Sequence, residues 1–339
     1  MFNVAVVGYG HIGKRHCENI IKNPNMDLVA VCDPFVIPQD LPKEGIWWND
    51  LNEMIGSYLN YESDHDIDLI IVATPNHLHF EMVNLCLEAG YPTLAEKPLA
   101  LNTHEVELLV QTAEKNKVPI FVNYPLRFLE SVDYLKNNLK LIGEPRIIQF
   151  NVLWNRNENY YQSSDWKGMA DLDGGPMFNE FIHHLNLLKY FFGNLNNITG
   201  YTHDFAHDYT EVEDTGIMRF TTNKGGLGNF TYTVACPEKS FDVALTVVGD
   251  KGSFKMSELF LNRIRINNDE KDFEVNMNHF AEVLEAVRLK IVEGIDDSRL
   301  CTIYEAGSDV QTIQTFYHSA NPSKRPKGKN QTIFLKETF

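Results

Sequence analysis

The chain has 339 residues, of which 43 % are hydrophobic and 22 % charged, and its formal net charge at pH 7 is −16. The length favours two domains, and the composition is typical of a soluble globular protein rather than a disordered, fibrous or membrane protein. The negative charge argues against nucleic acid as a partner, because phosphate binding requires lysine and arginine. We interpret the short basic run 323–329 as a solvated loop.

Residues 1–7 contain an apolar run that we interpret as a first strand, because it lacks the basic start and cleavage site of a signal peptide. No later run approaches the ~20 apolar residues of a membrane helix, so we expect a cytoplasmic protein. The five cysteines are scattered and odd in number, which favours reduced thiols over disulfides or a zinc site.

The segment 3–13, NVAVVGYGHIG, passes from a β-branched run into a helical pattern with the spacing G-x-G-x-x-G. Such glycines allow a tight turn, close approach of the backbone to a pyrophosphate, and contact between helix and strand, and the first amides of the helix then face the phosphates. We expect this turn to bind a dinucleotide through Gly8, Tyr9, Gly10, His11, Ile12 and Gly13.

A second strand, LVAVCDP, ends at Asp33, whose carboxylate can accept hydrogen bonds from both hydroxyls of an adenosine ribose. The same charge repels a 2′-phosphate, and Pro34 offers no cation in its place. The sequence therefore favours NAD over NADP.

Strand and helix patterns then alternate, with strands predicted at 68–75, 91–98 and 118–124 and helices at 76–90 and 103–116. Crossovers of this length require a mostly parallel sheet covered on both faces. In such sheets ligands bind beyond the carboxyl ends of the strands. The residues expected at those ends are Thr74, Pro75, Glu96, Lys97, Asn123 and Tyr124.

The segment AEKPL, residues 95–99, places a carboxylate and an ammonium directly after a buried strand. Such a pair is costly there unless it is used or satisfied. Its position beside the predicted dinucleotide site indicates use in binding or catalysis. The alternative is that Glu96 and Lys97 form a surface ion pair.

The segment 174–188, GGPMFNEFIHHLNLL, predicts an α-helix with Asn179, His183 and Asn186 on one face, because they are spaced by four and three residues. His184 points about 100° away from His183, so we interpret it as a structural residue. The alternative for His183 is a core histidine satisfied by the backbone.

Together, the motifs GYGHIG, VCDP, ATPNHLH, AEKPLA, NYPLRF and GGPMFNEFIHHLN resemble, in this order, the glucose-fructose oxidoreductase and inositol dehydrogenase family, also called Gfo/Idh/MocA. The resemblance implies a Rossmann domain over 1–125 and a substrate-binding and oligomerisation domain over 126–339 with a large, mostly antiparallel open sheet. It adds Asn76, His79, Glu96 and Lys97 to the cofactor site. It also implies a homodimer or homotetramer.

The second half independently predicts strands with one wet face, because polar and apolar residues alternate over 145–154, 215–223, 227–236 and 242–250.

The resemblance further implies that the helix carrying His183 packs under the nicotinamide, with His183 and Lys97 facing the substrate. Alcohol oxidation needs a base that titrates near neutrality, which histidine does unshifted and lysine does when its pKa is lowered. We predict His183 as the acid/base and Lys97 as the group that orients the same oxygen, although the two roles can be exchanged. Asn179 and Asn186 would contact substrate or orient the imidazole.

The segment 156–168, RNENYYQSSDWKG, mixes aromatic rings and amides, as sugar sites do. Tyr160, Tyr161, Trp166 and Lys167 are candidate wall residues, and the alternative is a loop that merely covers the sheet. The pattern resembles 3-dehydrogenases of UDP-linked N-acetylamino sugars and their uronic acids. The cationic side chains of Arg127 and Lys167 suit a carboxylate or pyrophosphate, and Asn123 completes the predicted substrate set.

We therefore predict an NAD-dependent dehydrogenase that oxidises a nucleotide-sugar hydroxyl, at C3 by resemblance. The alternatives are a free pyranose, inositol or polyol dehydrogenase and a non-enzymatic regulator that senses NAD. We expect no metal site, and interpret the polar cluster of His203, Asp204, His207 and Asp208 as a connection between strands.

Overall fold

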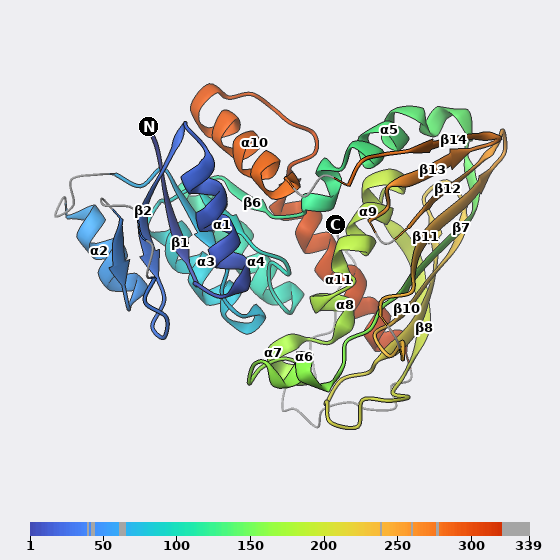
Figure 1. Ribbon diagram of the computed structural model, residues 1–339, viewed down its shortest axis with the longest axis horizontal. Helices are drawn as coiled ribbons and strands as arrows, with labels where there is room; N and C mark the ends of the chain where they lie inside the picture. The colour runs from blue at the N-terminus through green and yellow to red at the C-terminus, as the bar shows by residue number, and fades with distance from the viewer. Residues whose placement is uncertain are drawn as a thin grey trace.

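The computed structural model describes residues 1–38, 41, 45–60, 66–237, 239–258, 260–275 and 278–320. Two sheets, each with helices packed on it, lie side by side in Figure 1. The first comes mainly from the N-terminal part of the chain, drawn in blue and cyan. The basic run 323–329 falls outside the described residues.

The first sheet has the strand order β15-β6-β5-β4-β1-β2-β3. Its strands are β1 (Phe2–Val7), β2 (Met26–Cys32), β3 (Ile46–Trp48), β4 (Leu69–Val72), β5 (Thr93–Ala95), β6 (Ile120–Val122) and β15 (Cys301–Thr302). All pair in parallel except β15, which is antiparallel to β6. Its helices are α1 (His11–Lys22), α2 (Leu51–Leu59), η1 (Asn76–Leu78), α3 (His79–Glu88), α4 (Thr103–Asn116) and α10 (His279–Glu293). The predicted Rossmann-type sheet is confirmed.

The register of this sheet aligns the carboxyl ends of its central strands. Val7 pairs with both Cys32 and Val72, and the alignment continues through Ala95 to Val122. Strands β4 and β5 are buried throughout, and β1 is buried at every position except Asn3, since helices cover both faces of the sheet. The residues that follow them therefore share one edge: Gly8, Asp33, Thr74, Glu96, Lys97 and Asn123.

The second sheet is open and has the order β14-β13-β12-β11-β7-β10-β9-β8. Its strands are β7 (Pro145–Leu153), β8 (Leu195–His203), β9 (Thr215–Thr222), β10 (Leu227–Thr233), β11 (Asp242–Gly249), β12 (Ser253–Ser257), β13 (Arg263–Ile266) and β14 (Asp269–Asp272). Every neighbouring pair is antiparallel except β7 with β10, so the predicted mostly antiparallel sheet is confirmed. The accompanying helices are η2 (Pro125–Phe128), α5 (Glu130–Asn138), η3 (Leu139–Leu141), α6 (Glu158–Gln162), α7 (Ala170–Asp173), α8 (Pro176–Asn179), α9 (Ile182–Phe192) and α11 (Ile303–Ser319).

One face of the second sheet packs on helices, and the other lies open. Along β9 the buried side chains Met218 and Phe220 alternate with the exposed Ile217 and Arg219. Figure 1 places α9 and α11 on the inner face, between the two sheets. Within the described part of the chain, Figure 1 shows no helix on the outer face.

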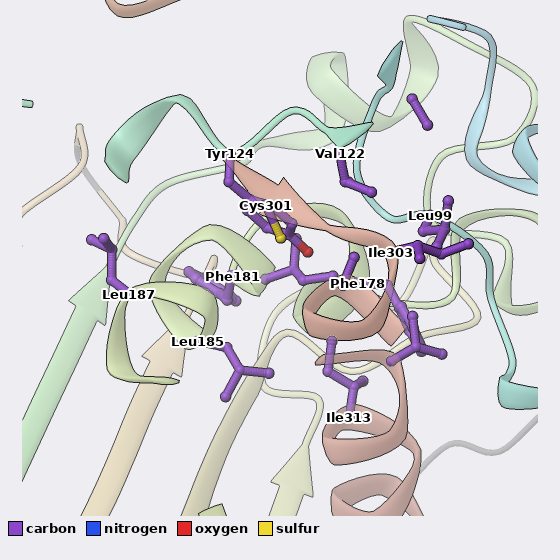
Figure 2. Close-up of a cluster of buried hydrophobic side chains, with 14 of the residues drawn as sticks. Leu99, Val122, Tyr124, Phe178, Phe181, Leu185, Leu187, Cys301, Ile303 and Ile313 are labelled. Carbon is purple, nitrogen blue, oxygen red and sulfur yellow. The ribbon is translucent and has the colours of Figure 1, made fainter. Parts of the chain in front are cut away.

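A continuous apolar cluster joins the two halves of the molecule. Val122 and Tyr124, at the end of β6, pack in the same cluster as Phe181 and Leu185 of the α8–α9 segment and Ile303 of α11. Figure 2 labels these side chains, with Tyr124 drawn beside Cys301 and Leu185 farther from it. Burial of each such side chain contributes roughly 1.5–3 kcal/mol, so the cluster fixes α8 and α9 relative to the edge of the first sheet.

The predicted continuous helix over 174–188 is wrong. The segment forms the short helix α8, which ends at Asn179, and the longer helix α9, which begins at Ile182. Asn179 therefore does not share one regular helix face with His183 and Asn186. The amides of Glu180 and Phe181 both donate to the carbonyl of Pro176, which ends α8 and leaves the Asn179 carbonyl available to a side chain from the other sheet.

The division of the chain at residue 125 stays a prediction. Two elements from far beyond it, α10 and β15, return to the first sheet: α10 packs on α1, and β15 pairs with β6. None of the helices in the described ranges is long and apolar enough to cross a membrane.

Candidate functional site

The glycine turn between β1 and α1 has the shape of a phosphate cradle. Gly8 has a φ of +92°, and a Cβ there would lie 2.5 Å from the Ala73 carbonyl oxygen. A Cβ at Gly13 would lie 1.9 Å from the carbonyl oxygen of Gly8, so helix and turn touch directly. A Cβ at Gly10 meets nothing within 4 Å, and no side chain caps the first amides of α1. These amides suit an anion, and Tyr9, His11 and Ile12 lie on the same turn, partly or fully exposed.

Asp33 closes this turn from the end of β2. Its Oδ2 accepts a hydrogen bond from the amide of Tyr9 (2.7 Å), and its Oδ1 accepts from the amides of Phe35 and Val36 (both 2.8 Å). The carboxylate therefore lies beside the glycine turn, with acceptor capacity left at Oδ2, which accepts a single hydrogen bond among the described residues. Its predicted contact with the ribose stays a prediction.

Next to this edge, Thr74 and Pro75 are partly exposed after β4, whereas Asn76 and His79 are buried. The ring nitrogens of His79 lie 2.6 Å from the carbonyl of Pro98 and 2.8 Å from that of Thr74. Burial lowers the pKa of His79, and the two carbonyls act in the opposite direction. Asn76 donates to the carbonyl of Asp173 (3.0 Å). Both side chains therefore brace the site from within, and neither stays among our proposed cofactor contacts.

Glu96 forms a buried triad rather than an ion pair with Lys97. Its Oε1 lies 2.8 Å from Nε2 of His16 and accepts a hydrogen bond from Nδ2 of Asn123 (2.6 Å). Burial alone would raise the pKa of Glu96, but the contacts with His16 and Asn123 outweigh burial and lower it. The amide nitrogen of the predicted substrate residue Asn123 is thus held by Glu96, and Asn123 is fully buried.

Lys97 crosses from the first sheet to the second. Its ammonium Nζ donates a hydrogen bond to the backbone carbonyl of Asn179 at 2.7 Å. The break between α8 and α9 makes this carbonyl available. The side chain remains partly exposed, with hydrogen-bonding capacity left for a ligand.

His183, in the first turn of α9, lies near this ammonium. The ring is partly exposed and packs edge-on against Tyr124, with centroids 5.8 Å apart. Its Nδ1 has no hydrogen-bond partner among the described residues. Burial, followed by the positive charge of Lys97, lowers the pKa of His183 well below its ordinary value. The imidazole is therefore neutral at pH 7 and can accept a proton.

Asn179 contacts both Lys97 and the predicted wall of the substrate site. Its Nδ2 donates to the hydroxyl of Tyr160 (3.4 Å), and Tyr160 in turn donates to the buried carboxylate of Glu180. Lys167 lies over the Tyr160 ring, 4.4 Å from its centroid, and Trp166 beside it is partly exposed. These residues stay together as a substrate-site candidate.

Tyr161 differs from Tyr160, because its side chain packs into the protein. It is buried, and its ring packs edge-on against Tyr160 and His207, at 5.2 and 5.4 Å between centroids. Its role is therefore to support Tyr160, and we do not retain it as a substrate contact.

Arg127 and Asn186 must also be removed from the predicted substrate set. Arg127 is 1 % exposed, and it donates to Oδ1 of Asn186 (2.7 Å) and to Glu305 (3.0 Å). Asn186 donates to Asp309 (2.6 Å), which also pairs with Lys189 (3.0 Å). Nearly all of this polar capacity is used inside the protein, beneath α9, because a buried guanidinium requires paired acceptors.

His184 is a core residue, as the sequence indicated. Its ring is 3 % exposed and packs edge-on against Phe150 and Trp154. Burial lowers the pKa of His184 to about 3. The ordinary histidine pKa is near 6.5, so below pH 6.5 the unfolded chain binds a proton that the folded chain does not bind until about pH 3.

Stability should therefore fall as the pH drops from 6.5 towards 3, and His184 should contribute about 2 kcal/mol of the loss between pH 7 and pH 5. In His184→Gln this fall in the free energy of unfolding should be smaller by that amount, as measured by urea denaturation at both pH values. His104→Gln, at an exposed position, serves as the control and should keep the wild-type difference. An equal fall in wild type and His184→Gln would contradict a neutral, buried ring.

Two family models match the chain. One, an oxidoreductase family with an NAD-binding Rossmann fold, matches residues 2–124, and the other, the GFO/IDH/MocA C-terminal domain, matches residues 139–255. The chain belongs to the GFO/IDH/MocA oxidoreductase family. Its N-terminal sheet is thus the NAD-binding Rossmann fold of that family, and the prediction of NAD as cofactor is confirmed.

Relatives of this GFO/IDH/MocA protein have several activities. The chain is 26 % identical over 285 residues to a 2,7-anhydro-N-acetylneuraminate hydratase of Escherichia coli K12, and the aligned segment covers 81 % of this chain and 73 % of the hydratase. It is 23 % identical over 320 residues to the NAD⁺-dependent scyllo-inositol 2-dehydrogenase of Bacillus subtilis 168, covering 86 % and 89 %. For three relatives, the matched segment spans between 56 and 73 % of their length.

Among solved structures, the fold is similar to that of the WlbA dehydrogenase from Bordetella pertussis, which was crystallised with NADH and UDP-GlcNAcA. The TM-score is 0.81 at 22 % identity, over 94 % of this chain and 96 % of that one. At this identity the likeness shows the GFO/IDH/MocA fold alone.

Four further residues that the sequence did not indicate lie around the site: His16, Arg156, Asp173 and Glu180. His16 holds Glu96, and Arg156 pairs with Glu180 at 2.7 Å. Asp173 accepts a hydrogen bond from the amide of Gly168 (2.6 Å), and burial raises its pKa to about 7. The only sequence signal was position, because Arg156 opens the aromatic segment and Asp173 directly precedes the Gly-Gly turn. Among the described residues, no group of three or more histidine, cysteine or acidic side chains is arranged to hold a metal.

Proposed function

We propose that this protein is an NAD-dependent dehydrogenase that acts on a secondary hydroxyl of a sugar. The observation that supports this best is the approach of Lys97 to the α8–α9 segment. Its ammonium binds the Asn179 carbonyl and acts electrostatically on His183, so one cation and one neutral base from different sheets lie close to each other. A hydroxyl that is losing a hydride needs both a donor to hold its oxygen and a base to take its proton.

In the proposed reaction His183 takes the hydroxyl proton. Its lowered pKa keeps the imidazole unprotonated at neutral pH, in the form that can take a proton, and makes it a weaker base than an ordinary histidine. Lys97, already oriented by Asn179, donates a hydrogen bond to the same oxygen and stabilises the negative charge that develops there. Bound NAD would supply the hydride acceptor.

The residues that would hold the dinucleotide fit this role. Gly10 leaves its surroundings open, the first amides of α1 lack a side-chain cap, and Asp33 lies beside them as a carboxylate for ribose hydroxyls. Thr74 and Pro75 follow at the same edge of the sheet, next to Lys97.

For the substrate we propose a UDP-linked N-acetylamino sugar or its uronic acid, oxidised at C3. Two facts support this class: a WlbA dehydrogenase with the same fold binds UDP-GlcNAcA, and Tyr160, Trp166 and Lys167 provide aromatic and cationic groups beside Asn179. Aromatic faces suit the apolar side of a pyranose, and cations suit its acidic groups.

The test is NADH formation, followed at 340 nm, with a panel of UDP-sugars and of free sugars and inositols. We expect turnover with UDP-N-acetylamino sugars or their uronic acids, and NAD preferred over NADP. Turnover confined to free sugars or inositols would contradict the nucleotide-sugar assignment. Similarity to the scyllo-inositol dehydrogenase supports that second candidate, a free pyranose, inositol or polyol dehydrogenase, which the same panel detects.

We also propose a homodimer or homotetramer that forms through the outer face of the second sheet. This face exposes apolar side chains on four neighbouring strands: Ile147 on β7, Ile217 on β9, Leu227 on β10 and Val248 on β11. Apolar groups collected on one sheet face are typical of an interface between protein chains. Light scattering that gives a monomer mass would contradict this proposal.

A further inference from the structure

Two cations lie against one aromatic ring next to the catalytic lysine. The guanidinium carbon of Arg156 is 4.9 Å from the centroid of the Tyr160 ring, and Nζ of Lys167 is 4.4 Å from the same centroid. Arg156 lies also over Trp154, and Lys167 lies also near Trp166. We refer to Arg156, Tyr160 and Lys167 as the cluster. All three residues are partly exposed, so a ligand can reach them.

The charges of this cluster do not balance. Glu180 neutralises Arg156, with which it pairs at 2.7 Å, and its other oxygen accepts from the hydroxyl of Tyr160. Lys167 has no carboxylate within ion-pair distance in the described part of the chain. Glu180 and, more weakly, Asp173 act on Lys167 electrostatically, but Glu180 already pairs with Arg156, and burial raises the pKa of Asp173 to about 7, which reduces the negative charge of this carboxyl at neutral pH. One positive charge therefore remains uncompensated in a chain whose net charge is −16.

Hydrogen-bond donors also remain unused. Lys167 spends one of its three donors on the hydroxyl of Ser163 (2.9 Å), which leaves two. Nε of Arg156 is buried without a partner among the described residues, although its other nitrogens contact Glu180 and the Asn155 carbonyl. Two half-buried cations beside a single ionised carboxylate are unfavourable unless a second anion joins them.

The cluster is connected directly to the proposed reaction centre. Asn179 donates through its side chain to the hydroxyl of Tyr160 (3.4 Å) and accepts through its carbonyl from Lys97 (2.7 Å). One residue thus touches both the cluster and the catalytic ammonium. A group bound at the cluster would therefore lie close to a small molecule held by Lys97.

We propose that Arg156, Tyr160 and Lys167 form a subsite for an anionic group of the sugar substrate, a carboxylate or a phosphate oxyanion. This inference rests on the proposed function and narrows its substrate class. The substrate carries an acidic group, and this group binds to the cluster close to the carbon that is oxidised. Arg127, which the sequence suggested for this task, is buried elsewhere.

The experiment measures binding by isothermal titration calorimetry to full-length, NAD-saturated protein. The probes are UDP-GlcNAcA and UDP-GlcNAc, which differ in a carboxylate against a neutral hydroxymethyl group, and glucuronate against glucose as the matched pair without pyrophosphate. The variants are Lys167→Gln, Lys167→Arg, which restores the charge, and Ser163→Ala, which removes only the contact that anchors Lys167. Thermal melting confirms that each variant folds.

We expect Lys167→Gln to weaken binding about tenfold, while Lys167→Arg and Ser163→Ala stay within about twofold of wild type. A loss confined to the acidic member of a pair identifies a carboxylate in the subsite, and an equal loss for both UDP-sugars identifies a phosphate. Unchanged binding of every probe in Lys167→Gln, no binding of any probe to the wild type, or an equal loss in Ser163→Ala would overturn the proposal. NADH formation is scored separately, so charge-dependent binding without turnover contradicts the proposed reaction and supports the subsite.

Discussion

His183→Ala and Lys97→Ala should each lower kcat by about 10²- to 10⁴-fold, the usual contribution of a positioned acid or base. In the proposed mechanism His183 is the neutral base, because burial and the charge of Lys97 lower its pKa. In the same proposal Lys97 holds the reacting oxygen, and the hydrogen bond to the Asn179 carbonyl orients its ammonium. Turnover is measured by NADH formation, and NAD affinity by calorimetry.

NAD affinity should stay close to that of the wild type in the His183 variant, since the glycine turn and Asp33 lie on another element. The exposed Lys140→Ala should match the wild type in both measurements and serves as control. The pH profile offers a second check. Because the pKa of His183 is lowered, the wild-type oxidation rate should not fall as the pH drops from 7 to 6.5, as it would with an unshifted histidine. Unchanged turnover in both alanine variants would eliminate this mechanism.

The largest loss of stability should come from Arg127→Met, which we expect to reduce the free energy of unfolding by about 3–5 kcal/mol. The substitution removes the guanidinium that satisfies Oδ1 of the buried Asn186 and pairs with Glu305. Asn186 is 1 % exposed, so its oxygen would lose its partner without gaining water. Urea denaturation measures the change.

Arg146→Met, at an exposed position on β7, is the matched control and should change stability by less than about 0.5 kcal/mol. Glu305→Gln should cost less than Arg127→Met, because its side chain is 44 % exposed and retains water as a partner. If Arg127 instead contacted substrate, its replacement would raise KM and leave the unfolding curve in place. That result would support the prediction from the sequence that Arg127, in the motif NYPLRF, contacts the substrate.

The first sheet was predictable because its signals are local. The glycine turn, where Gly8 has a φ of +92°, and the carboxylate of Asp33 after a β-branched run are both signalled by residues that are neighbours in sequence. The parallel register of the strands then brings Gly8, Asp33 and Lys97 to one edge of the sheet. None of these local signals depends on what the second half of the chain packs against.

The second half was less predictable because its contacts are tertiary. Helical spacing placed Asn179 and His183 on one face, but α8 ends between them. Helical spacing predicted the side of α9 on which Asn186 lies. It did not predict that Arg127 and Asp309 hydrogen-bond to Asn186 on that side. Arg156 carries no local mark that separates it from a surface arginine, and only the positions of Tyr160 and Glu180 give it a role.

The return of α10 and β15 to the first sheet affects how the chain can be made. During synthesis the dinucleotide half leaves the ribosome first, yet β6 keeps an open edge until Cys301 and Thr302 arrive, and α1 lacks its neighbour α10 until then. Open strand edges recruit other chains, so a nascent or truncated N-terminal half is the stage most exposed to aggregation. The cofactor fold is finished by the last segments of the chain that the structure describes.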